Sequence, residues 1–201
     1  MKQQDFWKGE FGDSYIERNK SKELIASNLF LFVEILKKSG ILPVSILELG
    51  ANIGLNLDAL HELLPECETT GVEINKKAAQ ILNESRHQLI QGDIEEVVIP
   101  KTYDLVFTKG VLIHLNPESL QAVYKKMFNA SNRWILLIEY YSRSPQEIPY
   151  RGHQGMLFKR DFAGELLEKF RNSLELKEYG FIYHRDLFPQ DDLTWFLMEK
   201  K

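Results

Sequence analysis

Apolar residues recur at helical spacing along residues 21–39, SKELIASNLFLFVEILKKS. Ser21 stands where a helix cap is expected and Gly40 where a helix stops, so the pattern predicts one helix across this range. The run VSILEL follows, and its β-prone apolar residues predict a short buried strand over residues 44–49.

Strand-like and helix-like patterns then alternate through the middle of the chain. The expected strands are residues 69–72, 87–90, 103–108 and 134–138, and the expected helices are residues 56–64, 76–83 and 117–129. This alternation is typical of βαβ units in a largely parallel sheet. Two later β-prone runs, residues 179–183 and 193–198, lie close enough in sequence to predict a hairpin and therefore one antiparallel strand.

Composition limits the function without naming one. The chain has 201 residues, 44% of them apolar, which is enough for one substantial core. The net charge is −4, and no run of Lys or Arg is long enough to follow a phosphate backbone, so nucleic acid is disfavoured as a partner. Cys67 is the single cysteine, which excludes an internal disulfide and a cysteine-based zinc site. No close cluster of His, Asp and Glu stands out, so we expect no metal.

The start of the chain, MKQQD, has no basic and apolar leader, and no apolar run reaches the roughly 20 residues that span a membrane. We therefore expect a cytoplasmic protein without a membrane partner. The oligomeric state is left open by the sequence.

The sequence ILELGANIGLN at residues 46–56 carries the strongest chemical signal. A strand that runs into Gly50 and Gly54 and then into a helix lets backbone approach a ligand closely and directs free amides at it. A dinucleotide fingerprint that started at Gly50 would require glycine where Asn52 and Leu55 stand. An NAD-linked oxidoreductase is therefore disfavoured, and the pattern that remains is E-x-G-x-x-x-G.

This pattern, from Glu48 to Gly54, resembles the loop after the first strand of class I S-adenosylmethionine-dependent methyltransferases. The resemblance implies a Rossmann-like α/β fold, with a mostly parallel seven-stranded sheet, a C-terminal antiparallel hairpin strand and helices on both faces. It also implies S-adenosyl-L-methionine as cofactor and S-adenosyl-L-homocysteine as product. The commoner form of the loop has a small residue where Asn52 stands, although Asn tolerates left-handed backbone angles well.

The same resemblance assigns residues farther along the chain. Glu73 ends the second strand, where an acid binds the ribose hydroxyls, and Asp93 follows the third strand, where an acid meets the adenine amine. The exit of the fourth strand lies beneath the methionine portion of the cofactor. The implied cofactor-binding residues are Tyr15, Glu48, Gly50, Ala51, Asn52, Gly54, Asn56, Glu73, Ile74, Asp93, Ile94 and Lys109.

A narrower resemblance begins near the N-terminus. The pattern W-x-G-x-F-G-D-x-Y-x-x-R-N at residues 7–19 is similar to the pseudaminic acid biosynthesis-associated methyltransferases, and the similarity continues through GANIGLNL, TKGVLIHLNP, RGHQGMLFKRDFAGE and DDLTWFLMEK. This group implies a role in surface polysaccharide or nonulosonic acid biosynthesis. We expect residues 1–40 to form a helical cap or lid segment and residues 41–201 to form the methyltransferase domain.

The stretch FWKGEFGDSYIERN, residues 6–19, is too irregular a mixture to predict an ordinary amphipathic helix. Its aromatic residues would cover the cofactor or substrate, with glycines that let the segment bend. Asp13 and Arg18 would meet the ammonium and carboxylate of the methionine moiety. The alternative is that the aromatic side chains simply dock this terminal segment on the core.

A hydroxyl acceptor needs a base near the methyl group, and His114 and His153 are the candidate catalytic residues. The segment RGHQGMLFKRDF supplies three basic residues that suit an acidic substrate, namely Arg151, Lys159 and Arg160. Each has a plainer interpretation, since VLIHL recurs in this fold as scaffold and a basic loop is often only solvated. Tyr140, Tyr141 and His184 are further pocket candidates.

Three functions remain open. The first is a methyltransferase acting on a small, acidic or sugar-type metabolite. The second is a methyltransferase for RNA or a protein side chain, although the acidic composition and the lack of an Asn/Asp-Pro-Pro-aromatic stretch after the fourth strand disfavour it. The third is a non-catalytic module that binds S-adenosylmethionine.

Overall fold

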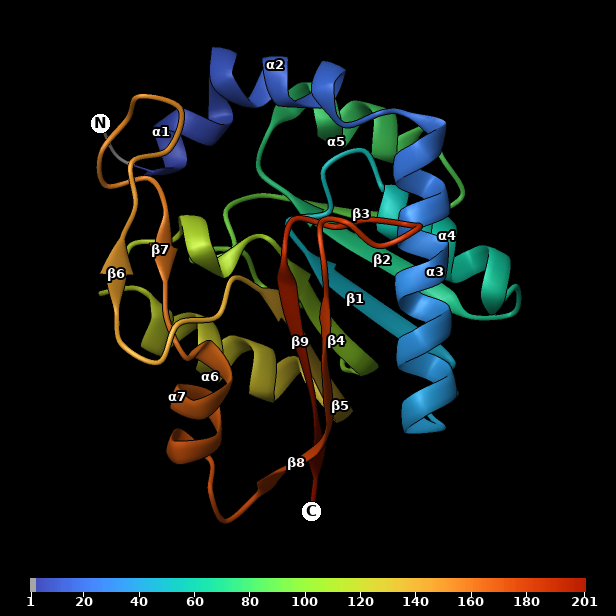
Figure 1. Cartoon of the computed structure of the whole chain (residues 1–201). Coiled ribbons are helices and arrows are strands. Elements are labelled where there is room, and N and C mark those ends of the chain that lie inside the picture. The colour runs from blue at the N-terminus through green and yellow to red at the C-terminus, as the bar shows by residue number, and fades with distance from the viewer. Residues whose placement is uncertain (1–2) are drawn as a thin grey trace.

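A computed structural model describes residues 3–201 of the chain. Its centre is a seven-stranded sheet with the order β3-β2-β1-β4-β5-β9-β8 (Figure 1). The strands are β1 (Ser45–Leu49), β2 (Glu68–Glu73), β3 (Gln88–Gln91), β4 (Tyr103–Lys109), β5 (Ser131–Glu139), β8 (Leu174–Ile182) and β9 (Leu193–Lys200). The first five of these strands run parallel to one another, whereas β9 is antiparallel to both of its neighbours, β5 and β8. The predicted fold, with its C-terminal hairpin, is confirmed.

Helices cover both faces of the sheet. On one face lie α3 (Lys22–Ser39), α4 (Leu55–Leu63) and α5 (Lys76–Asn83), and on the other lie α6 (Leu120–Ala130) and α7 (Phe162–Lys169) (Figure 1). The predicted limits of α3 are confirmed, because the Ser21 hydroxyl accepts from the Leu24 amide at 3.3 Å and Gly40 adopts a left-handed φ of 68°.

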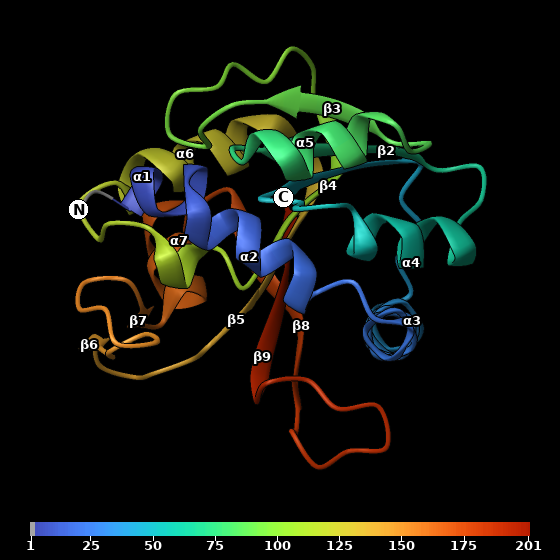
Figure 2. The same cartoon turned by 90° about the horizontal axis from the view of Figure 1, so that it is seen from above.

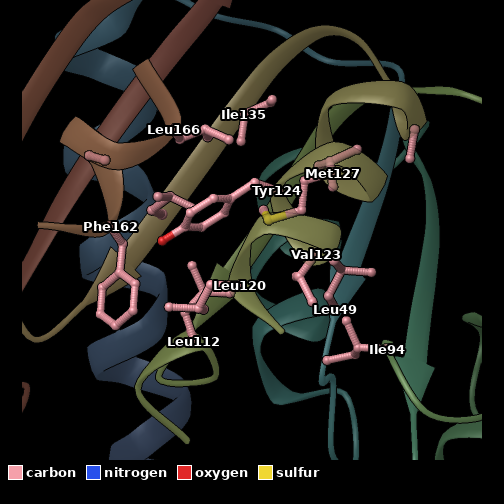
Figure 3. Packing of buried hydrophobic residues seen from close by; sticks show 14 of the residues in the cluster. Leu49, Ile94, Leu112, Leu120, Val123, Tyr124, Met127, Ile135, Phe162 and Leu166 are labelled. Carbon is pink, nitrogen blue, oxygen red and sulfur yellow. The ribbon is translucent and has the colours of Figure 1, made fainter. Parts of the chain in front are cut away.

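Alternation along each strand divides the apolar side chains between two cores. Ile46 faces α3 and α4, whereas its neighbour Leu47 faces α6 and α7. Figure 3 shows the second core, in which Leu120, Val123, Tyr124 and Met127 of α6 point toward side chains of the sheet and of α7. The buried Tyr124 hydroxyl donates to Glu165 at 3.0 Å, so this polar group has a hydrogen-bond partner inside the core.

The sheet has its topological switch point at β1. Its neighbours are β2 on one side and β4 on the other, so the connections leave the carboxyl ends of β1 and β4 in opposite directions. Ligands of open parallel sheets bind in the crevice that this arrangement creates. Two short helices, α1 (Gln3–Lys8) and α2 (Glu10–Arg18), cross above this end of the sheet (Figure 2).

Residues 6–19, whose pattern does not predict an ordinary amphipathic helix, are largely helical in the structure. The segment forms two helices separated by Gly9, and tertiary packing of Phe6, which is buried, outweighs its irregular pattern. The sequence also did not predict α7, the 3₁₀ turn η1 (Leu112–His114), or the short hairpin β6 (Gln146–Glu147) and β7 (Phe158–Lys159).

The helix α3 contributes Leu31, Phe32 and Ile35 to the core shared with the sheet. The division of the chain at residue 40 stays a prediction, and it does not coincide with a gap in packing. Among residues 3–201, none of the helices combines the length and the apolar character needed to cross a membrane.

Candidate functional site

A cavity of about 180 Å³ lies at the carboxyl ends of β1, β2 and β4, beneath α1 and α2. Segments far apart in the sequence line it: the loop after β1, the ends of β2, β3 and β4, and the N-terminal helices. Among residues 3–201, no three His, Cys, Asp or Glu side chains lie close enough together to hold a metal ion.

The loop after β1 requires left-handed backbone at three positions. Gly50, Asn52 and Gly54 have φ values of 78°, 49° and 91°. A Cβ on Gly50 would lie 2.6 Å from the Val111 side chain, so glycine is required there by space as well as by conformation. Asn52 occupies a conformation that Asn adopts more readily than most residues, which explains its place in the loop.

Glu73, at the end of β2, anchors this loop. Its carboxylate accepts from the backbone amide of Asn52 at 2.7 Å and from that of Asn75 at 2.6 Å. Burial raises the pKa of Glu73, and these backbone hydrogen bonds oppose the rise. The Asn75 side chain in turn caps α5 by accepting from two of its first amides. The acid thus joins the glycine loop to the start of α5 at the wall of the cavity.

Asp93 and Ile94 line the cavity beyond the end of β3. Asp93 is buried, and its Oδ1 accepts from the Glu95 amide at 2.9 Å. The Glu95 carboxylate accepts from the Gln4 side chain at 2.8 Å, so this loop also holds the first helix.

Two ionisable side chains, Glu48 near the end of β1 and Lys109 at the end of β4, lie next to the glycine loop. Glu48 is completely buried, accepts from the Asn56 side chain at 2.6 Å, and has a pKa that burial raises to about 8. Lys109, at the end of β4, lines the cavity, and burial lowers its pKa while the charge of Glu48 opposes that shift. Among residues 3–201, Lys109 is the one lysine or arginine in the cavity wall, and it has no carboxylate within ion-pair distance.

His114 ends η1 and forms part of the cavity wall. Its Nδ1 lies 2.6 Å from the Met156 carbonyl oxygen, which can only accept, so Nδ1 carries the hydrogen and Nε2 keeps its lone pair. Burial lowers the pKa of His114 to about 4, so the ring is neutral at pH 7. The rings of Trp7 and Tyr150 pack against it, each with a centroid separation of 4.8 Å.

The helices α1 and α2 cover the cavity, and some of their aromatic side chains form this roof. Trp7 and Tyr15 line it, with ring centroids 5.3 Å apart, whereas Phe6 and Phe11 stack on each other outside it. The side chain of Gln3 donates to the Gly155 carbonyl at 2.9 Å, and this hydrogen bond attaches α1 to the loop that contains Gly155.

The predicted roles of Asp13 and Arg18 are not supported by their positions. Asp13 forms an ion pair with Lys77 at 2.5 Å and accepts from Asn75 at 2.9 Å, so its carboxylate ties α2 to α5. The Arg18 guanidinium lies over the Phe11 ring at 5.1 Å. Neither residue lines the cavity.

Comparison with known proteins agrees with this geometry. Residues 46–132 match the family model described as "Methyltransferase domain". Over 89 residues, 42% of its length, the chain is 30% identical to malonyl-[acyl-carrier protein] O-methyltransferase of Priestia megaterium, and it spans 32% of that relative. Residues 46–132 are therefore similar to methyltransferase domains, and the chain spans about a third of the curated relative's length.

Solved structures extend the likeness to nearly the whole chain. Magnesium protoporphyrin IX methyltransferase from Synechocystis PCC 6803 has a TM-score of 0.71 at 14% identity, with 98% of each chain covered. The plantazolicin methyltransferase has a TM-score of 0.66 at 15% identity, covering 99% of this chain and 94% of that one. The fold is that of the class I methyltransferases.

In this methyltransferase fold, most of the predicted cofactor-binding residues lie around one cavity. Those that line it are Tyr15, Gly50, Ala51, Asn52, Asn56, Glu73, Ile74, Asp93, Ile94 and Lys109. Glu48 and Gly54 lie behind the lining, where Glu48 holds Asn56 and Gly54 starts α4. Their contact with a cofactor stays a prediction.

The basic segment after β5 is placed differently from its prediction. Arg151 and His153 are exposed in a turn, and the His153 ring packs edge-on against Phe6 at 5.0 Å. Arg160 forms an ion pair with Glu165 at 2.7 Å, and Lys159 lies over the Tyr140 ring at 4.7 Å. None of these four basic residues lines the cavity, so the roles expected of His153 as a base and of the others in substrate binding stay predictions.

The sequence analysis did not predict several residues of the cavity wall that come from α1, from α3 and from loops. They are Gln3, Gln4, Asn19, Asn28, Asn75 and Val111. Helical spacing offers a signal for Gln3 and Gln4, which lie one turn before Trp7, but that signal depends on recognising α1. The further candidates Tyr140, Tyr141 and His184 do not line the cavity, and His184 instead pairs with Asp192 at 2.8 Å.

Proposed function

We propose that this chain is an S-adenosylmethionine-dependent methyltransferase that acts on a small metabolite. The observation that carries the proposal is the convergence of the glycine loop, Glu73 and Asp93, which come from three separate strand ends, on one cavity. The residues fit a nucleoside with an amino-acid tail: two acids are available for hydroxyl and amine groups, and the Lys109 side chain lines the cavity with no carboxylate partner among residues 3–201.

The relatives support this proposal. The solved plantazolicin methyltransferase is in complex with SAH, and the magnesium protoporphyrin IX methyltransferase has been solved with SAH and with SAM. The curated relative is an O-methyltransferase. These proteins act on different molecules. Their likeness to this chain therefore supports methyl transfer as the reaction, whereas the acceptor has to be inferred from the cavity of this chain.

The bound cofactor would supply a methyl group on a positively charged sulfur. The chain's own contribution is alignment of an acceptor oxygen or nitrogen, exclusion of water by α1 and α2, and removal of the acceptor's proton. We propose that His114 receives this proton at Nε2, because its Nδ1–H is held by the Met156 carbonyl. The low pKa of His114 keeps Nε2 available at neutral pH.

For the acceptor we propose a small acidic or sugar-type metabolite, in keeping with surface polysaccharide or nonulosonic acid biosynthesis. The support is the roof, in which Trp7 and Tyr15 close over the cavity and limit the size of an acceptor. The resemblance of residues 7–19 to the pseudaminic acid-associated group points the same way. The basic residues at 151–160 stay the expected partners of this acid, because Lys109 is proposed above to meet the amino-acid tail of the cofactor.

Calorimetric titration tests the cofactor. Wild type should bind S-adenosylmethionine and S-adenosylhomocysteine but not NAD. Glu73→Ala should weaken binding by about 1.5–3 kcal/mol, roughly tenfold to more than a hundredfold, because hydrogen bonds to a charged group are lost. Glu68→Ala is the matched control, since Glu68 is at the opposite end of the same strand and pairs with Lys101. NAD binding, or S-adenosylmethionine binding indifferent to Glu73→Ala, would contradict the proposal.

Methyl transfer from tritiated S-adenosylmethionine tests the acceptor. Free nonulosonic acids, nucleotide-linked sugars, transfer RNA and unmodified protein would be offered in parallel, with His114→Phe as the control for the base. Label in an acidic sugar that depends on His114 supports the proposal. Label confined to RNA or protein would instead establish the macromolecular alternative, and cofactor binding without any transfer would favour a binding module.

A further inference from the structure

Glu139 is a buried acid at the end of β5 that borders the cavity wall without lining it. Its exposed fraction is 3%. Oε1 accepts from the backbone amides of Val111 and Leu112, each at 3.1 Å, and Oε2 accepts from the amide of Ile113 at 3.4 Å. One carboxylate therefore receives three consecutive backbone donors at the start of η1.

These donors have no partners within the turn itself, because the first amides of a helix lack intrahelical acceptors. Capping side chains usually come from the residue that precedes the helix, and a carboxylate is favoured there by its charge as well as by its two acceptors. Here the cap comes from a neighbouring strand. The amide of Gly110 also donates to the Ile138 carbonyl at 2.9 Å, so residues 110–113 are attached to the end of β5 by four hydrogen bonds.

The segment held in this way carries two parts of the cavity wall. Val111 fills the space beside Gly50, and His114 completes the turn. The imidazole of His114 has a second attachment, its Nδ1–H to the Met156 carbonyl, but the position of its backbone depends on η1. An altered turn would therefore move Nε2 relative to the rest of the cavity.

We propose that Glu139 is a positioning residue, whose carboxylate fixes η1 and thereby sets the placement of His114 and Val111 at the acceptor side of the cavity. Its effect on turnover rests on the function proposed above. Its effect on the geometry of His114 does not, and the two can be measured separately.

Glu139→Gln is the informative variant. Glutamine keeps one oxygen and places an NH₂ group where the other oxygen accepted, so at least one backbone donor of η1 faces another donor. Glu139→Asp keeps an acceptor-only carboxylate on a shorter side chain and serves as the conservative variant. Asp161→Asn is the matched control, because the Asp161 carboxylate caps α7 through the Gly164 amide at 2.8 Å and does not line the cavity.

Nitrogen-15 NMR of the imidazoles gives the direct measurement, with the His114 signal assigned by its loss in His114→Phe. Wild type and Asp161→Asn should show a neutral ring protonated at Nδ1. Glu139→Gln should shift these signals or mix the two tautomers, and Glu139→Asp should restore them in part. Folding of each variant is checked by circular dichroism. If Glu139→Gln does not fold, the His114 signals of Glu139→Asp are compared with those of wild type, and unchanged signals in that variant would overturn the proposal.

Binding and turnover complete the test. Glu139→Gln should lower kcat with the acceptor found above by about tenfold or more, while S-adenosylhomocysteine affinity should fall less, since Glu73 and Asp93 are untouched and the glycine loop is affected only through Val111. Unchanged His114 signals in a folded Glu139→Gln protein would overturn the proposal. If wild type fails to bind S-adenosylhomocysteine, the methyltransferase function fails instead, and the NMR result still decides the role of Glu139.

Discussion

The backbone amide of Asn52 donates to the carboxylate of Glu73 at 2.7 Å. This hydrogen bond closes the glycine loop of β1 onto the end of β2, and it uses the main chain of Asn52 rather than its side chain. The loop therefore depends at this position on a backbone angle, φ 49°, more than on an amide group.

Asn52→Gly should keep the loop and cofactor binding intact, because glycine adopts positive φ without strain. Asn52→Val should lower the free energy of unfolding by about 1–2 kcal/mol, since a β-branched residue is disfavoured in left-handed backbone. Urea unfolding and calorimetry with S-adenosylhomocysteine check both. Equal loss of affinity in the two variants would mean that the Asn52 side chain itself contacts the cofactor.

Gly50→Ala and Gly40→Ala form a matched pair, because both glycines have positive φ, 78° and 68°. The new methyl group would lie 2.6 Å from Val111 in the first case and has nothing within 4 Å in the second. Gly40→Ala should cost only the backbone strain, about 1–2 kcal/mol, and keep cofactor binding. Gly50→Ala should lose roughly a further 1–3 kcal/mol from overpacking, together with cofactor binding. Similar stabilities for the two variants would contradict the crowding at Gly50.

Lys109→Met removes the cation of the cavity wall and keeps the length of the side chain. If Lys109 meets the carboxylate of the cofactor's amino-acid tail, S-adenosylhomocysteine affinity should fall by about 1.5–3 kcal/mol, while affinity for methylthioadenosine, which lacks that carboxylate, should not change. The control is Lys76→Met, at the exposed start of α5. If both ligands keep their affinity, the acid that Lys109 binds belongs to the acceptor; equal losses for both would contradict a carboxylate contact.

Burial of His114 predicts a pH dependence of stability. Its pKa is about 4 in the folded chain against 6.5 for an unperturbed histidine, so the unfolded chain binds a proton that the folded chain does not. Its contribution is therefore complete above pH 6.5 and is lost as the pH falls toward 4, by about 3 kcal/mol in total. Chemical unfolding at several pH values should show a shallower acid-side decline in His114→Phe than in wild type. Parallel profiles would show that His114 titrates normally.

Trp7→Ala should speed the release of S-adenosylhomocysteine, because Trp7 lines the cavity and packs on His114. The loss of a large contact predicts an affinity lower by roughly 1–2 kcal/mol. Phe11→Ala removes another aromatic ring of the same segment that lies outside the cavity, and it should change the affinity less. Stopped-flow fluorescence measures the dissociation rates. Equal effects of the two variants would mean that the aromatic set only docks the helices.

Much of the fold could be predicted from the sequence, because the spacing of apolar residues along the chain matches the side chains that are buried in each helix and strand. The run at residues 44–49 and the helix at 21–39 have clear patterns and clear ends, and their predicted positions are confirmed. A helical cap was expected at the N-terminus, but the bounds of α1 and α2 could not be predicted, since α1 has six residues and is stabilised by tertiary contacts such as that of Phe6 with His153.

Some residues of the candidate site could likewise be predicted from the sequence, and others could not. Residues fixed to strand ends, such as Glu73 and Asp93, could be placed because strand order determines where they meet. The basic residues at 151–160 could not, because the chain there leaves the sheet in the β6–β7 hairpin and Arg160 finds an internal partner in Glu165. Glu139 gave no signal, as a strand-end acid reveals its three amide partners only in the folded chain.

The roof of the cavity belongs to a part of the chain that the matched domain, residues 46–132, does not include. Substitutions in α1 and α2 would therefore alter the cover of the cavity, and with it the exclusion of water, while leaving the strand ends beneath it unchanged.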